Sequence, residues 1–333
     1  MNKQQIKVIG DASVDFVLGP VEGWPRKGTE TLVRHSEMRP GGSAGNAALA
    51  LAELGWPVAL YSACGSDDMG QWLCAHFGAG VELHLPRIAG PTTSTVAILH
   101  ACGERSFFTT PGHLELIARD TVAAAVPHQL PGHANAGAAH AGQLALLCGP
   151  FLTPPLRAAY GEFIAQLRAS GHQVALDTGW PSGGWTEPVR AQALDWIRAC
   201  DHVLLNEIEV SGLAGGDTSE AALAQLASAM RPGATLVMKM GPGGACAIRD
   251  GVRVQARAPV AEVFDTVGAG DAFNAGYLAA ISRGDDLSAA LAFGCATATA
   301  IIARFPRRAS GDPAPGSFPN SPQHSQEVHR DAA

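Results

Sequence analysis

The chain has 333 residues, of which 47% are hydrophobic and 16% charged, and its 30 acidic and 23 basic residues give a net charge of −7. This length and apolar content allow one large domain or two modest ones with a well-buried core. The Lys and Arg residues are scattered, which argues against a nucleic-acid partner; the seven cysteines are far apart and include no Cys-x-x-Cys pair, which argues against a disulfide framework or a thiolate zinc site.

The first residues are polar and lead directly into a short apolar run at 6–9. They show no secretion signal, and no apolar stretch of the sequence is long enough to cross a bilayer. We therefore expect a cytoplasmic protein with reduced thiols and no membrane partner.

Short apolar runs alternate with amphipathic segments along most of the chain. The runs predict buried strands at 7–9, 58–61, 145–148, 174–176, 202–205 and 235–238. The segments between them predict helices at 44–54, 68–77, 155–169, 188–199, 219–230, 271–282 and 287–303. This alternation predicts an α/β fold whose mostly parallel sheet is covered by helices on both faces.

Two segments depart from the alternation. In 29–36 and 93–108, β-branched and aromatic residues alternate with polar ones between turn signals, which predicts a small β-sheet standing off the main domain. A segment rich in Ala, Gly and His at 131–142 predicts a loop, because its three histidines lack the helical spacing and the nearby carboxylates of a metal site. From Pro306 onward apolar residues almost vanish, so we expect a disordered tail over 306–333.

The most informative segment is 265–276, a glycine-rich turn that brings Asp271 to the start of an apolar helix. Gly268 and Gly270 let the backbone approach a ligand closely, and the first N–H groups of a helix are unpaired donors at a positive dipole end, where phosphate groups bind. A carboxylate at such a place would repel its own ligand unless it takes a proton from an attacking hydroxyl. That arrangement is typical of a kinase active site.

Asn206 and Glu209 follow the predicted strand at 202–205. Their oxygen atoms could hold Mg²⁺, directly or through water. The same spacing is also nearly that of a capping box, in which Asn206 begins a helix and Glu209 is its third residue. The residues themselves leave both interpretations open.

The segment 265–276 closely resembles the C-terminal signature of the PfkB family of carbohydrate kinases, the ribokinase-like enzymes, and the resemblance extends over nearly the whole chain. Other segments resemble further motifs of that family, in the same order. They are its N-terminal glycine-rich motif at 41–46, its Gly-x-Asp-x-x-Gly turn at 65–70, its Asn-x-x-Glu motif at 206–209 and its entry to the nucleotide site at 239–244. The resemblance implies a ribokinase-like fold and ATP-dependent phosphorylation of a hydroxyl on a small sugar or sugar-like compound.

The resemblance also implies a role for each residue that matches a motif. The general base is Asp271, and the anion hole is formed by the amides of Gly268, Ala269 and Gly270. The sugar is bound by Asp15, Gly42, Asn46 and Arg105, and the nucleotide by Asn206, Lys239, Gly241, Gly243, Thr266 and Asn274. The metal ligands are Glu209 for Mg²⁺ and Asp265 for a monovalent cation, K⁺, beside the anion hole. Asp11 is expected to support the turn after the first strand rather than to bind substrate.

The resemblance further implies one kinase domain over 1–305, with a lid formed by about 12–40 and 92–110 that closes over the substrate and excludes water. An isolated sheet needs its exposed apolar face covered, so a homodimer through the lid is expected. The acceptor stays open between ribose, fructose, a sugar acid, inositol and a nucleoside. Ribose is less expected, because Ser43 stands where ribokinase-type motifs often carry Lys.

Three other functions would each require further features of the sequence. A nucleoside kinase of the same fold needs an apolar platform for the base, for which Phe16, Phe107 and Phe108 are candidates. A serine hydrolase could use Ser43 in its Gly-x-Ser-x-Gly pattern, but it needs a strand running straight into that serine, and we expect Arg39-Pro40 to break such a strand. A non-catalytic sugar or nucleotide sensor would not need Asp271. Dinucleotide-binding and P-loop motifs are absent from the sequence.

Overall fold

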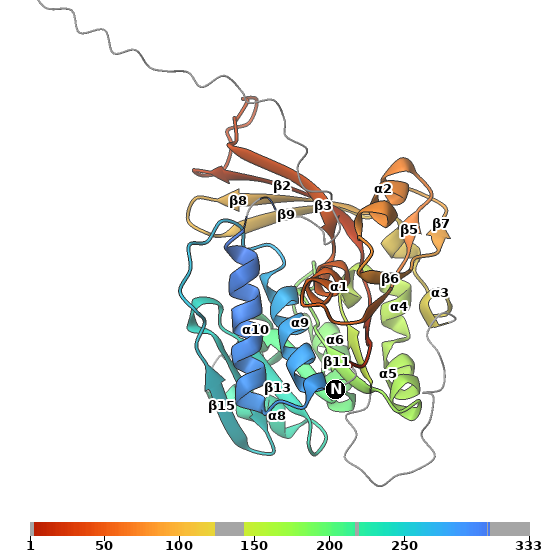
Figure 1. Cartoon of the computed structure of the whole chain (residues 1–333), viewed down its shortest axis with the longest axis vertical. Helices are drawn as coiled ribbons and strands as arrows, with labels where there is room; N and C mark the ends of the chain where they lie inside the picture. The colour runs from red at the N-terminus through yellow and green to blue at the C-terminus, as the bar shows by residue number, and fades with distance from the viewer. Residues whose placement is uncertain (1–2, 124–142, 217–219, 305, 307–333) are drawn as a thin grey trace, which may run out of the picture.

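The computed structural model describes residues 3–123, 143–216, 220–304 and 306. They form a large sheet between two layers of helices, with a smaller sheet lying across one end (Figure 1). The predicted loop at 131–142 and the predicted tail beyond Pro306 lie outside the described residues.

The large sheet is mostly parallel, as the sequence predicts. Its strand order is β15-β14-β13-β12-β11-β10-β1-β4-β6. Every neighbouring pair from β13 to β6 is parallel, whereas β14 and β15 extend the sheet as an antiparallel hairpin. The strands are β1 (Ile6–Ile9), β4 (Val58–Tyr61), β6 (Val81–His84), β10 (Leu144–Leu147), β11 (Gln173–Leu176), β12 (His202–Asn206), β13 (Thr235–Lys239), β14 (Ala245–Arg249) and β15 (Val252–Ala256). The strands β6, β14 and β15 were not among those predicted.

Helices cover both faces of the large sheet, because successive strand residues point to opposite sides. Val8 packs in one core with α1, α9 and α10, whereas its neighbour Ile9 packs in the other core with α5 and α6. The helices are α1 (Ser43–Glu53), α2 (Asp68–His76), α3 (Arg119–Ala123), α4 (Pro154–Ala158), α5 (Tyr160–Ala169), α6 (Glu187–Ala199), α7 (Glu207–Leu213), α8 (Glu220–Ser228), α9 (Ala269–Arg283) and α10 (Leu287–Ile302). The predicted bounds agree within two residues, except that the segment predicted as one helix over 155–169 forms α4 and α5, with a break at Ala159.

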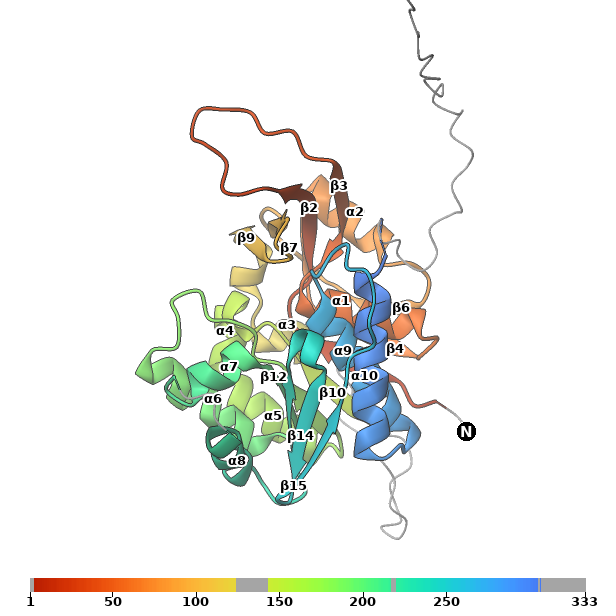
Figure 2. The ribbon, with the colours of Figure 1, turned by 90° about the vertical axis from the view of Figure 1, so that its left-hand side faces the viewer.

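The small sheet has the strand order β3-β2-β8-β9. Its strands are β2 (Ser13–Val21), β3 (His35–Gly41), β8 (Ser94–His100) and β9 (Arg105–Thr110). The predicted strand at 29–36 is wrong except for its last two residues, and the connection that contains it projects beyond the sheet (Figure 2). The predicted strand region 93–108 corresponds to β8 and most of β9. A further pair of two-residue strands, β5 (Cys64–Gly65) and β7 (Arg87–Ile88), forms a sheet of its own.

Parallel strands bring their carboxyl ends to one edge of the sheet, and ligands of open α/β sheets bind beyond that edge. Here β1 is followed by Asp11, β11 by Asp177 and β12 by α7, while β13 ends at Lys239. The small sheet leads into the same region, because β3 ends at Gly41 and α1 begins at Ser43. The predicted site residues therefore lie mainly at one edge.

Among the helices of the described residues, none combines the length and the apolar composition that crossing a bilayer requires.

Candidate active site

The start of α9 has the geometry of an anion site. Gly268 is its N-cap residue with φ 74° and ψ 7°, a left-handed conformation that glycine adopts without steric cost. The first bond of the helix runs from the Ala272 amide to the Gly268 carbonyl at 2.9 Å. The amides of Gly270 and Asp271 therefore precede the first helical bond and lie at the positive end of the dipole. The Ala269 amide, by contrast, donates to the Thr266 carbonyl at 3.2 Å, so this predicted member of the anion hole is already used within the turn.

Asp271 lies in the first turn of α9 and is partly exposed. The side-chain amide of Asn46, on α1, donates to Asp271 Oδ2 at 3.1 Å. Burial raises the pKa of Asp271 well above its ordinary value, and the charge of Asp177 raises it further. A carboxylate with a raised pKa is a stronger base for a proton on a hydroxyl group. The structure thus joins the residue predicted as the base to a residue predicted to bind the sugar.

Asp15 lies on β2 and is buried, with Ser13 Oγ donating to its Oδ1 at 3.0 Å. A Cβ atom at Gly41 would overlap the Asp15 carboxyl group, so a residue without a side chain is needed there. Burial raises the pKa of Asp15 to about 6, although the nearby Arg39 charge acts to lower it. The carboxylate is buried away from water. Hydroxyl groups that donate to it would replace the hydrogen bonds to water that burial removes.

Asp11 supports the start of α1. Its Oδ2 accepts from the Ser43 amide at 2.9 Å and its Oδ1 from the Ala44 amide at 3.2 Å. The N-cap residue, Gly42, has φ 81°, and a Cβ there would collide with the Asp11 carbonyl. Asp11 therefore has a structural role at the start of α1, whereas the sequence predicted one in the turn after β1. Gly42 lies where the backbone passes too close to Asp11 for a side chain.

Lys239 ends β13 inside a polar cluster, part of which was not predicted. Its Nζ donates to Asp177 Oδ2 at 2.8 Å and to Asn274 Oδ1 at 3.2 Å. Asn274 is fully buried and donates from Nδ2 to Asp177 Oδ2 at 2.6 Å. Burial alone would lower the pKa of Lys239, but the charges of Asp177 and Glu209 raise it, so the ammonium stays charged. Asp177 directly follows the apolar strand β11, which was the available signal.

Asn206 and Glu209 form the capping box of α7. Glu209 Oε2 accepts from the Asn206 amide at 2.8 Å, and Asn206 Oδ1 accepts from the Glu209 amide at 2.9 Å. Burial raises the pKa of Glu209 to about 7, and the Asp177 charge contributes to this rise. The capping-box interpretation of this pair is confirmed. Only the other carboxylate oxygen of Glu209, Oε1, is then left to interact with a metal ion.

The side chains near Glu209 show how Mg²⁺ could be held in this site. Across 3–123, 143–216, 220–304 and 306, no group of three or more His, Cys, Asp or Glu residues is placed to hold a metal ion. Mg²⁺ commonly keeps several waters and binds through one or two carboxylates and the phosphates of its nucleotide. Glu209, whose pKa is raised by burial and by the charge of Asp177, suits that mode rather than an all-protein cage.

Asp265 is already paired with a cation of the protein itself. Its Oδ1 accepts from the Val267 amide at 2.8 Å, and its Oδ2 lies 2.7 Å from Arg39 Nη1. The side chains are 7% exposed for Arg39 and 0% exposed for Asp265. The residue predicted to hold K⁺ therefore does not offer a free carboxylate to a second cation.

Three of the remaining predicted residues, Arg105, Gly241 and Gly243, are exposed. Arg105 is exposed at the start of β9, opposite Leu99, whereas the level of Asp15 on that sheet is Thr109. At roughly 3.4 Å per residue these levels are about 14 Å apart along the strands, so the structure does not bring Arg105 beside Asp15. Gly241 and Gly243 form one exposed turn after β13, with φ 50° at Gly241.

The expectation that Arg39-Pro40 breaks the strand before Ser43 is wrong, because β3 includes both residues and runs straight to Gly41. Proline is tolerated there since β3 is an edge strand. The catalytic arrangement of a hydrolase is nevertheless not formed: within the described residues, no hydrogen bond joins Ser43 to a histidine, and its amide is held by Asp11. A nucleophilic serine needs such a base within hydrogen-bond reach.

The chain is similar to known kinases over most of its length. A family model described as pfkB family carbohydrate kinase matches residues 3–311. A fructokinase of Klebsiella pneumoniae is 30% identical over 285 residues, which cover 84% of this chain and 84% of that protein. An aminoimidazole riboside kinase of Salmonella typhimurium is 30% identical over 296 residues, which cover 85% of this chain and 82% of that protein.

Solved structures support the same fold. The adenosine kinase of Sinorhizobium meliloti superposes with a TM-score of 0.73 at 22% identity, covering 92% of this chain and 95% of that one. The ribokinase of Thermotoga maritima superposes with a TM-score of 0.65 at 21% identity, covering 91% and 94% of the two chains. The ribokinase-like architecture predicted from the sequence is confirmed.

Proposed function

The chain belongs to the PfkB family of carbohydrate kinases and is an ATP-dependent kinase, and from this premise we propose that it phosphorylates a hydroxyl group of a small uncharged sugar or sugar-like compound with Asp271 as the general base. The contact between Asn46 and Asp271 carries the proposal. This hydrogen bond connects the motif at 41–46, proposed to bind the acceptor, with the motif at 265–276, proposed to transfer the phosphoryl group.

The acceptor hydroxyl would be oriented by Asp15, Asn46 and the close backbone at Gly42. Asp271 takes the proton of that hydroxyl as the hydroxyl oxygen attacks the γ-phosphorus of ATP and the bond to the leaving ADP breaks, and the raised pKa of Asp271 suits it to the task. The amides of Gly268 and Gly270, together with the dipole of α9, stabilise the negative charge of the transferring group. Since Ala269 is engaged with Thr266, the amide of Asp271 takes its predicted place.

The nucleotide side is proposed to lie around Lys239, Asn206 and the turn at Gly241–Gly243, with Thr266 at the rim. A Cβ atom at Gly270 would lie 3.4 Å from Lys239 Nζ, which places the ammonium beside the anion site. Asn274 holds Lys239 in that position rather than facing the nucleotide. When bound, Mg²⁺ neutralises phosphate charge and orients the phosphates; Glu209 would hold it through water.

The charges of the acceptor side support an uncharged acceptor. Asp11 raises the pKa of both Asp15 and Asp271, so these three carboxylates share one negative field. Arg39, the direct cross-strand partner of Asp15, is engaged with Asp265. A carboxylate or phosphate on the acceptor would meet this field without a free partner, which is unfavourable in a buried site.

A panel of acceptors tests the proposal. ATP consumption is expected with fructose, ribose or another neutral sugar or polyol, and the corresponding sugar acids and sugar phosphates are expected to react far more slowly. A riboside is the second candidate acceptor, because one relative with 30% identity is an aminoimidazole riboside kinase. The panel should pair each sugar with its phosphate or its acid. Preference for the charged member of each pair would refute the proposed acceptor class.

The pH dependence of sugar binding provides a second prediction. Asp15 accepts hydroxyl donors fully only as a carboxylate, and its pKa is raised to about 6. The KM for the sugar is therefore expected to rise by about tenfold per pH unit below that value. Asp15→Asn should raise the KM and abolish this dependence.

The raised pKa of Asp15 affects folding in the opposite direction. Asp15 favours the folded state most at low pH, and this contribution to the free energy of unfolding is lost as the pH rises through about 6.

The small sheet is proposed to act as a lid and as a dimer contact. The domain is taken as 1–305, with the small sheet as a lid over the acceptor. A homodimer would cover the aromatic side of that sheet, where Trp24 lies 5.7 Å from Phe108 between ring centroids and both rings are exposed. Neither closure nor pairing is needed for the chemistry assigned to Asp271.

A further inference from the structure

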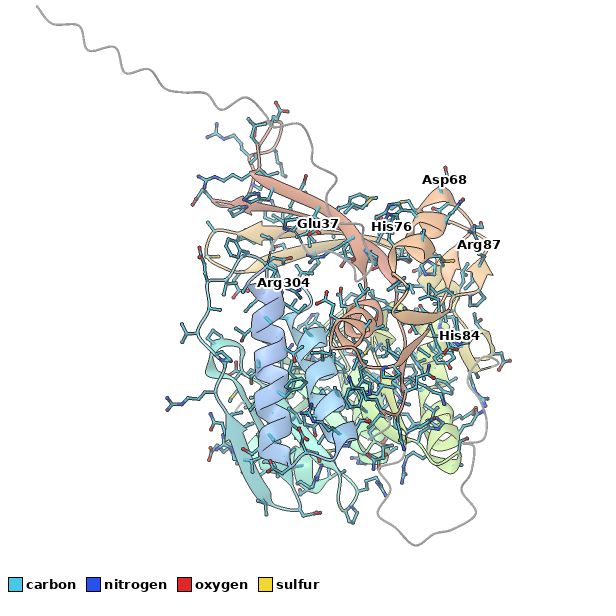
Figure 3. The ribbon with its side chains drawn as sticks, in the orientation of Figure 1. Glu37, Asp68, His76, His84, Arg87 and Arg304 are labelled. Carbon is cyan, nitrogen blue, oxygen red and sulfur yellow. The ribbon has the colours of Figure 1, made fainter. Side chains whose placement is uncertain are left out.

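A buried arginine joins the small sheet to the loop that precedes the anion site. Arg39 lies on β3, and its Nη1 is 2.7 Å from Asp265 Oδ2 and 3.3 Å from Glu37 Oε2. Glu37 is two positions earlier on the same strand and therefore shares a face with Arg39; Figure 3 shows it on the small sheet. Asp15 is the direct cross-strand partner of Arg39. Three carboxylates thus surround one guanidinium.

Asp265 in turn shapes the anion site. Its second oxygen accepts from the Val267 amide at 2.8 Å, and Gly268 follows at once as the N-cap of α9. The amides of Phe264 and Asp265 donate to the Ile302 carbonyl at 2.9 and 3.3 Å, which fastens the loop to the end of α10. The position of the Asp265 carboxylate therefore determines where the Gly268 turn and the amides after it lie.

A buried carboxylate needs a positive partner, because an uncompensated charge away from water is strongly unfavourable. A bound monovalent cation would be one solution, and the resemblance to ribokinase-like enzymes implies it. In this chain Arg39 already provides the charge, and it cannot diffuse away. The guanidinium is planar and presents its N–H donors in a rigid fork that matches a carboxylate, so it suits a permanent place beside Asp265.

We propose that Arg39 is a built-in cation that replaces K⁺ at Asp265 and positions the anion site, so that catalysis by this chain does not depend on a monovalent cation. This inference rests on the proposed role of the loop between Asp265 and Asp271. Arg39 is a positioning residue, because it acts through Asp265 and not on the transferred group.

The first test uses the unaltered protein. Its thermal unfolding and its kinase activity are measured in K⁺ and in tetramethylammonium at equal ionic strength. We expect neither the Tm nor the activity to differ between the two salts, because the proposal leaves no site for K⁺. A cation that binds only the folded state would raise the Tm. A higher Tm or a severalfold higher activity in K⁺ would overturn the proposal. The Tm comparison requires no substrate, so it stands even if the proposed acceptors all fail.

The second test removes the guanidinium. Arg39→Ala is expected to lower kcat by about 10²-fold, with a smaller change in the KM for ATP, because the donors of the anion site lose their alignment. Added guanidinium ion, below denaturing concentration, should restore part of kcat, and K⁺ should now activate the variant and raise its Tm. Arg39→Lys should keep more activity than Arg39→Ala.

The matched control is Arg231→Ala, which breaks an ion pair with Asp201 at the amino ends of the strands. Neither guanidinium nor K⁺ should affect its kcat. If Arg39→Ala does not fold, Arg39→Lys and the unaltered protein still decide the question. An Arg39→Lys variant with full activity and no response to K⁺ is expected under the proposal, whereas loss of kcat in Arg39→Ala that neither cation restores would contradict it.

Discussion

Replacing Asp271 by Asn is expected to lower kcat by about 10²–10⁴-fold, the usual contribution of a general base. The substitution keeps the size of the side chain and an oxygen that can accept from Asn46, so the contact that now measures 3.1 Å can survive. Only the ability to take a proton is lost. The measurement is steady-state kinetics with ATP and the best acceptor of the panel, with both KM values expected to change much less than kcat.

The pH dependence of kcat distinguishes the loss of a general base in Asp271→Asn from a change in the structure of the site. In the unaltered protein kcat should fall as pH drops through the raised pKa of Asp271, because the protonated acid cannot accept the proton. That limb should be missing in Asp271→Asn. Asp285→Asn is the control, since Asp285 pairs with Arg283 at the far end of α9. A kcat for Asp271→Asn within severalfold of the unaltered value would exclude Asp271 as the base.

Replacing Lys239 by Met is expected to impair both folding and turnover. The ammonium pairs with Asp177 and also interacts with the charge of Glu209, and the side chains of Lys239 and Asp177 are 11% and 8% exposed. Breaking such a pair leaves a carboxylate without its partner, so the free energy of unfolding should fall by about 3–5 kcal/mol. The value of kcat/KM should also fall, because the positive charge beside Gly270 is gone.

A double variant separates the two effects. In Lys239→Met with Asp177→Asn, the pair is neutral, so much of the lost stability should return while kcat/KM stays low. Urea unfolding and steady-state kinetics measure the two quantities on the same samples. Lys3→Met, which removes an exposed lysine over Trp56, is the control for the loss of one charge. Recovery of activity together with stability would show that Lys239 only supports the fold.

The parallel part of the fold follows from local patterns in the sequence. Continuous apolar runs such as 202–205 and 235–238 are strands buried on both faces, and few other structures accommodate them. The hairpin of β14 and β15 was missed because its second strand is mostly exposed and lacks an apolar run. Its turn was nevertheless visible, since Asp250-Gly251 is a favoured pair and adopts φ 50° and 77°.

The site was predicted where a motif places its residues close together in sequence. Asp271, Asn46 and Lys239 lie in such motifs, and the structure brings them to one edge of the sheet. Asp177 and Arg39 were missed because their significance depends on partners far along the chain, Lys239 and Asp265. A short local pattern also cannot separate a capping box from a metal ligand, since the same Asn and Glu spacing serves both.

The path from β3 into α1 explains which part of the chain tolerates a change of length. Within 39–46 the chain presents a guanidinium to Asp265, then leaves space for Asp15, then takes a positive φ at Gly42, and then presents an amide to Asp271. Insertion or deletion of one residue would turn every later side chain away from its partner. Length variation among descendants of this sequence should therefore gather in the connection between β2 and β3 and be excluded from this segment.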